Sequence, residues 1–108
     1  YITELGKRPQ NYNQIEGQYT GLIKIRSNKL AKLEKFYNQL DRSAIYDGKD
    51  FKNMYMTSFL QLLIDSGWKV KAVQVDSGWL EVDSLEDIRK YEKMEKDGEL
   101  DRFYKVEF

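Results

Sequence analysis

The 108 residues carry 18 basic and 18 acidic side chains, so the formal net charge is zero, and 41% of the residues are hydrophobic. This apolar content suits a folded core, whereas a chain without net charge has no long-range field to attract nucleic acid or an anionic membrane. Cysteine and histidine are both absent, which excludes disulfides, thiolate metal sites and histidine as a general base or zinc ligand. Any metal is therefore expected to be a hard, oxygen-ligated ion such as Mg²⁺.

Length and hydropathy favour one domain, residues 1–108, without a membrane segment. No apolar run approaches the about 18 residues that a transmembrane helix needs, and no signal-peptide pattern is present. We therefore expect a cytoplasmic protein with neither a membrane nor a nucleic-acid partner. Because the chain opens on Tyr1 and not on Met, we also expect it to be a piece of a longer protein.

The first forty residues predict two short strands and a helix. Residues 1–5 are prone to β structure and end at Gly6, and residues 22–26 alternate apolar with basic side chains, as a strand with one wet face does. Between Leu30 and Leu40, apolar residues recur at helical spacing.

The following segments predict a turn, a helix and another strand. Asp47-Gly48 signals a turn in a polar connection. Ser58 and Gln61 fit a capping box that opens a helix, and Gly67 is well placed to end it. Residues 69–75 are strand-like, and residues 103–108 predict a weak terminal strand or a helical tail.

The stretch from Trp79 to Asp87 predicts a strand that leads directly into a helix. Trp79, Glu81 and Asp83 alternate with two apolar residues, so the three side chains share one face of a strand. Ser84 and Asp87 then form a capping box for a helix that runs to about residue 96. Asp83 is expected just before that helix, at the positive end of its dipole.

Two interpretations of this junction stay open on spacing alone. Two strand steps separate Glu81 and Asp83 by about 6.6 Å, which suits one carboxylate as a Mg²⁺ ligand and the other as its neighbour. The alternative is an ordinary solvated strand edge before a capped helix. The chain also lacks a Gly-rich phosphate loop and a serine or cysteine nucleophile with a histidine base.

Three segments together resemble a known family. Residues 16–22 (EGQYTGL), 53–60 (NMYMTSFL) and 78–87 (GWLEVDSLED) resemble the C-terminal half of bacterial nucleotidyltransferases of the sugar-phosphate and phosphocholine cytidylyltransferase type. The resemblance implies an α/β fold: a Rossmann-like mixed β-sheet flanked by helices, of which this chain would be the C-terminal, acceptor-binding part.

The resemblance also implies a reaction and a set of site residues. In the family, a phosphate of the acceptor attacks the α-phosphorus of a nucleoside triphosphate and pyrophosphate leaves, with Mg²⁺ neutralising the developing charge. By position, Asp83 corresponds to a Mg²⁺ ligand and Glu81 to an acidic residue near the acceptor. Gln18 and Tyr19 correspond to a strand that lines the acceptor pocket, and Trp79 to a wall of that pocket.

The resemblance implies limits as well. The family's Gly-rich loop and first metal-binding aspartate are not in these residues, so we assign no catalytic residue here and expect the chain alone to be inactive. Ser58 stands where the family usually has an acid. Uncovered strand edges and apolar faces lead us to expect self-association, as a homo-oligomer.

The identity of the acceptor stays open among phosphocholine, an aminoalkyl phosphonate and a sugar 1-phosphate, and so does the nucleotide base. The tyrosines and tryptophans slightly favour a choline-like head group, because aromatic side chains bind quaternary ammonium. The alternative function is a non-catalytic binding or dimerisation module with a degenerate site.

Overall fold

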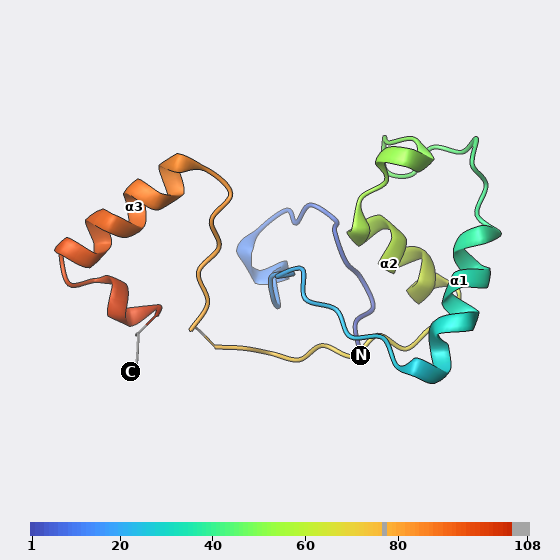
Figure 1. The fold of residues 1–108 in the computed structure, drawn as a ribbon, viewed down its shortest axis with the longest axis horizontal. Coiled ribbons are helices and arrows are strands. Elements are labelled where there is room, and N and C mark those ends of the chain that lie inside the picture. The colour runs from blue at the N-terminus through green and yellow to red at the C-terminus, as the bar shows by residue number, and fades with distance from the viewer. Residues whose placement is uncertain (77, 105–108) are drawn as a thin grey trace. The chain divides into compact units, whose positions relative to one another are not determined.

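The computed structural model describes residues 1–76 and 78–104, and the chain divides into two compact units, Tyr1–Ala72 and Val73–Phe108 (Figure 1). The first unit contains helices α1 (Leu30–Asn38) and α2 (Met56–Asp65), and the second contains α3 (Leu85–Lys96). Short 3₁₀ turns lie at Tyr12–Gln14, Ser27–Lys29, Phe51–Asn53 and Leu100–Arg102. That the chain is a single domain stays a prediction.

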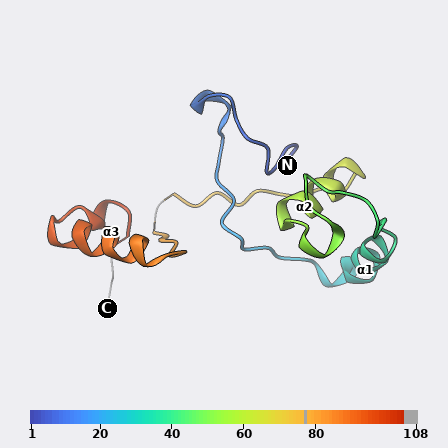
Figure 2. The same cartoon turned by 90° about the horizontal axis from the view of Figure 1, so that it is seen from above.

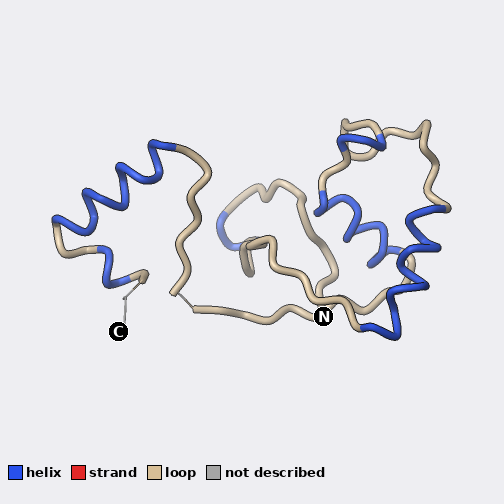
Figure 3. The backbone as a smooth tube through the Cα atoms, viewed as in Figure 1, coloured by secondary structure: helices blue, strands red, loops and turns tan. Residues whose placement is uncertain are grey.

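The predicted mixed β-sheet, and with it the α/β Rossmann-like fold class, is wrong for the described part of the chain (Figure 3). Residues 1–5, 22–26, 69–75 and 79–83, where the sequence predicts strands, run as irregular segments, and the one bridge described joins Tyr46 to Lys49 in a tight turn. A strand persists only where neighbouring backbone supplies partners for its N–H and C=O groups. Period-two alternation predicts the face that each side chain takes but supplies no such neighbour.

The helical predictions are confirmed, with one change at a helix start. α1 and α3 begin and end close to the predicted residues. α2 begins at Met56, two residues before Ser58, and its N-cap Tyr55 makes no capping hydrogen bond with its side chain. The predicted capping box of Ser58 and Gln61 is therefore wrong, because both residues lie inside the helix.

α2 supplies the core of the first unit. Leu60 and Leu63 are its buried hydrophobic side chains, 7% and 4% exposed, and Ser58 is buried beside them. α1 and α2 lie side by side in both views (Figures 1 and 2). Phe36 of α1 contacts Phe59 of α2, with ring centroids 6.0 Å apart, and Trp68 beyond α2 at 6.4 Å. Aromatic contacts at these distances add to the burial of apolar area.

Both α2 and α3 end in the same glycine stop. Gly67 has φ +93°, its N–H donates to the carbonyl of Ile64, and the N–H of Trp68 donates to the carbonyl of Leu63. These two bonds form a Schellman motif, which satisfies carbonyls that the helix end leaves without partners. Gly98 closes α3 in the same way, with φ +72°. The stop predicted at Gly67 and the helix end predicted near residue 96 are therefore confirmed.

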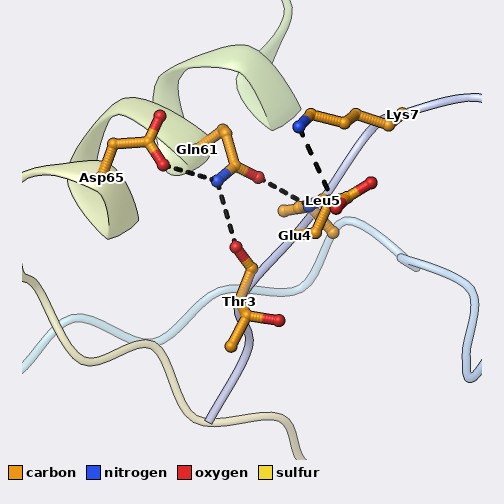
Figure 4. A network of polar contacts seen from close by, with 6 residues as sticks. All are labelled: Thr3, Glu4, Leu5, Lys7, Gln61 and Asp65. Atoms are coloured by element: carbon orange, nitrogen blue, oxygen red, sulfur yellow. Dashed lines mark hydrogen bonds and ion pairs between the residues drawn. The ribbon is translucent and has the colours of Figure 1, made fainter.

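The N-terminal segment is attached to α2 by one side chain (Figure 4). The amide of Gln61 accepts a hydrogen bond from the N–H of Leu5 at 2.7 Å and donates to the carbonyl of Thr3 at 3.2 Å. A primary amide offers the same donor and acceptor as a peptide group. Gln61 therefore takes the place that a neighbouring strand would have beside this segment.

Gly6 brings the same segment into close approach with α2. A Cβ atom on this residue would lie 2.8 Å from the Cβ of Thr57, and its φ is +77°. Both facts favour glycine, since side-chain-bearing residues rarely adopt this φ and the space for a methyl group is taken.

Candidate functional site

Asp83 lies directly before α3, at the position that the sequence predicts. Ser84 is the N-cap, and its Oγ accepts a hydrogen bond from the N–H of Asp87 at 3.2 Å. The carboxylate of Asp87 accepts from the N–H of Asp83 at 3.0 Å. The cap is therefore confirmed. In a standard capping box the carboxylate would accept from the N–H of the N-cap residue, whereas here it accepts from the N–H one residue earlier. The cap fixes the backbone of Asp83 and leaves its carboxylate exposed.

Glu81 and Trp79 precede Asp83 in the second unit. The carbonyl of Glu81 accepts a hydrogen bond from the hydroxyl of Tyr91 at 2.8 Å, so α3 fixes the backbone here as well. The side chain of Glu81 is exposed, and that of Trp79 is 44% exposed. All three side chains are thus available to a ligand, although the predicted strand that would align them is not formed.

Gln18 and Tyr19 lie in the first unit, in the irregular segment that follows Tyr12–Gln14. Gln18 is exposed and Tyr19 is half-buried. The structure holds each group of predicted residues within its own unit and fixes no distance between the groups. Their assignment to one site therefore stays a prediction.

The described residues of the junction do not supply a metal ion with a complete set of protein ligands. Within the described ranges, no group of three or more acidic, histidine or cysteine side chains is placed to hold a metal. Mg²⁺ commonly takes one or two protein carboxylates and completes its shell with substrate phosphates and water. The exposed carboxylate of Asp83 fits one such ligand.

A small pocket, which the sequence does not predict, lies beside α2 in the first unit. Its cavity volume is about 270 Å³, and its charged lining residues are Lys7, Asp47 and Asp65. Its remaining lining residues are Ile45, Tyr46, Ser58, Gln61 and Leu62. One sequence pattern could have pointed to this pocket. The spacing of Ser58, Gln61 and Asp65 puts three polar groups along one face of a helix.

A short hairpin shapes one wall of this pocket. Asp47 and Gly48 have φ angles of +49° and +80°, which is typical of a type I′ turn, and Tyr46 pairs with Lys49 on either side of them. The hydroxyl of Tyr46 donates to the carbonyl of Asp41 at 2.6 Å. The turn that the sequence predicts at Asp47-Gly48 is confirmed.

Two further local bonds form in the segment that leads into the hairpin. The Ser43 hydroxyl and backbone N–H both donate to the carboxylate of Asp41. These bonds, that of the hydroxyl first, hold the pKa of Asp41 below its usual value because they favour the charged form.

An apolar groove of about 760 Å³ also lies between α1 and α2. Tyr37 forms part of its lining and contacts Phe51 and Phe59, with ring centroids 5.3 and 6.0 Å away. Arg42 lies over the ring of Phe51 and Lys49 over the ring of Tyr55, at 5.0 and 5.7 Å. These cations already occupy ring faces at the edge of the groove, so the groove gives no specific support to a choline-like ligand.

Comparison with known proteins supplies the decisive observation. The chain is 49% identical over 88 residues to the CTP:phosphoglutamine cytidylyltransferase of Campylobacter jejuni subsp. jejuni serotype O:2 (strain ATCC 700819 / NCTC 11168). The chain is therefore similar to part of a cytidylyltransferase. The match covers 82% of the chain but only 35% of the relative, in its C-terminal portion. No family model and no solved structure matches.

This match confirms the resemblance to the cytidylyltransferase type of nucleotidyltransferase, and the chain spans about a third of the length of that enzyme. Among the described helices, none is long and apolar enough to cross a membrane.

Proposed function

We propose that the chain is the acceptor-binding part of a CTP-dependent cytidylyltransferase. An oxygen of the acceptor phosphate attacks the α-phosphorus of CTP, the bond from that phosphorus to the bridging oxygen of the β-phosphate breaks, and pyrophosphate leaves. The supporting observation is the 49% identity over 88 residues to an enzyme named for CTP and phosphoglutamine. We take a phosphorylated amino acid as the first candidate acceptor, ahead of phosphocholine, an aminoalkyl phosphonate or a sugar 1-phosphate.

Two groups of residues have proposed roles. Asp83 is a Mg²⁺ ligand, with Glu81 and Trp79 beside the acceptor, and all three side chains are exposed around a backbone that α3 fixes. Gln18 and Tyr19 are proposed to line the acceptor pocket. Bound Mg²⁺ would neutralise the charge that develops on the transferring phosphoryl group. The carboxylate of Asp83 would orient that ion.

Pyrophosphate release by the intact protein that carries this chain tests the proposal. CTP with phosphoglutamine and Mg²⁺ is expected to release pyrophosphate and form a cytidylylated acceptor, both of which ³¹P NMR detects. ATP, GTP and UTP serve as matched nucleotides, and each candidate acceptor is tested separately. No pyrophosphate release from any combination would contradict the proposed function.

A second proposal is that the 108-residue chain associates with itself. The alternative function, a dimerisation module, would require the same property. Large apolar side chains are exposed in the irregular segments of the described chain, among them Val73 and Val75 at 83% and 72%. Apolar side chains at such exposure promote association. Light scattering should give a mass above 12.9 kDa that rises with concentration. A constant monomer mass would contradict this proposal.

The cytoplasmic location of the protein stays a prediction.

A further inference from the structure

We propose that the pocket beside α2 binds the ammonium and carboxylate groups of an amino-acid acceptor. Its charged lining residues are one cation, Lys7, and two anions, Asp47 and Asp65. An α-amino acid carries the complementary pair of charges on adjacent positions. This inference rests on the proposed function, because it names a recognition site for the acceptor of that reaction.

The charge of Lys7 is available to a ligand carboxylate. Its Nζ is 3.9 Å from the carboxylate of Glu4, and the two side chains are 65% and 61% exposed. An ion pair at that distance and exposure contributes little to stability. A carboxylate in the pocket can therefore replace Glu4 at small cost.

Asp65 supplies a carboxylate for the ammonium group. Its Oδ1 accepts a hydrogen bond from Nε2 of Gln61 at 2.9 Å (Figure 4), and Asp65 lines the pocket. Asp47 adds a second negative charge to the lining from the hairpin. An ammonium group has three donors and needs several acceptors of this kind.

The pocket is small. Its cavity volume of about 270 Å³ lies just below the roughly 300–1,000 Å³ of pockets for drug-sized ligands, so it suits a smaller group such as an amino-acid head group. Buried Ser58 lies in its lining. The contact of Gly6 with Thr57 and the bond of Leu5 to Gln61 hold the backbone next to Lys7.

Two single variants of the intact protein test this inference. Lys7→Met removes the cation, and Asp65→Asn removes an anion while keeping an oxygen that accepts from Gln61. Each is expected to raise the KM for phosphoglutamine about tenfold, the effect of losing a hydrogen bond to a charged group. The kcat and the KM for CTP should not change.

Modified acceptors show which group of the acceptor each charged pocket residue binds. The KM for an acceptor whose α-carboxylate is an amide should be insensitive to Lys7→Met, and that for an acceptor without the α-ammonium should be insensitive to Asp65→Asn. Lys29→Met and Asp101→Asn are control variants, because both residues are exposed and neither lines the pocket. Equal effects of the pocket and control variants would overturn the inference.

Direct binding separates this inference from the proposed function. Titration calorimetry of phosphoglutamine into the intact protein without CTP should give a Kd that both pocket variants raise about tenfold. Binding that depends on these residues in a protein that releases no pyrophosphate would support the pocket and contradict the catalytic proposal. Pyrophosphate release together with an unchanged Kd in both variants would support the catalytic proposal and contradict the pocket.

Discussion

Replacement of Asp83 by alanine in the intact protein is expected to reduce Mg²⁺-dependent pyrophosphate release by about two orders of magnitude. A group that stabilises charge developing in the transition state contributes an effect of roughly this size. The fold should be preserved, because the cap of α3 uses the backbone N–H of Asp83 and the side chains of Ser84 and Asp87. Initial rates at saturating CTP and acceptor, over a series of Mg²⁺ concentrations, measure the loss.

Glu86→Gln is the matched control for Asp83→Ala. Glu86 is an exposed carboxylate in the first turn of α3, three residues away, so its substitution changes the local charge without removing the proposed ligand. We expect near-normal rates. A loss of the same size in both variants would assign the effect to charge at the N-terminus of α3, and full activity of Asp83→Ala would reject the ligand role.

The largest expected effect on stability comes from Leu63→Ala. Leu63 is 4% exposed and is, with Leu60, one of the buried hydrophobic side chains of the described chain. Truncation of a buried leucine costs about 2–5 kcal/mol, a large share of the about 5–15 kcal/mol that holds a domain folded. Thermal unfolding followed by far-UV circular dichroism should show the midpoint falling by about 10 °C or more.

Leu22→Ala is the control for the same chemical change at an exposed position. Leu22 is 73% exposed, so removing its side chain creates no cavity and should change the free energy of unfolding by about 0.5 kcal/mol or less. If both variants shifted the midpoint equally, α2 would not supply the core that the buried side chains indicate.

The helices were predictable because the sequence signals for a helix lie within the helix or directly beside it. Apolar spacing gives the face of α1, Ser84 and Asp87 give the start of α3, and Gly67 and Gly98 give the ends of two helices. These signals act within one or two turns. The start of α2 was missed because Ser58 and Gln61 match a capping pattern, whereas Ser58 is buried inside the helix and Gln61 bonds to the N-terminal segment.

The sheet was not predictable in the same way, because strand formation depends on residues far along the chain. Alternation at residues 22–26 and 79–83 is genuine, yet the described chain offers these segments no strand to pair with. The same limit applies to the pocket beside α2. Lys7, Asp47 and Asp65 are widely separated in sequence, and no local pattern relates them.

The amide of Gln61 has a consequence for the tolerance of the N-terminal segment to insertions. It engages the N–H of Leu5 and the carbonyl of Thr3, and a slip by one residue would offer it the equivalent groups of the neighbouring residues. Such a slip would also place a side-chain-bearing residue opposite Thr57, where a Cβ has no room. Gly6 therefore fixes the register of the segment against α2. An insertion or deletion before Gly6 would leave Lys7 in place. An insertion between Gly6 and Lys7 would move the charge of Lys7 out of the pocket.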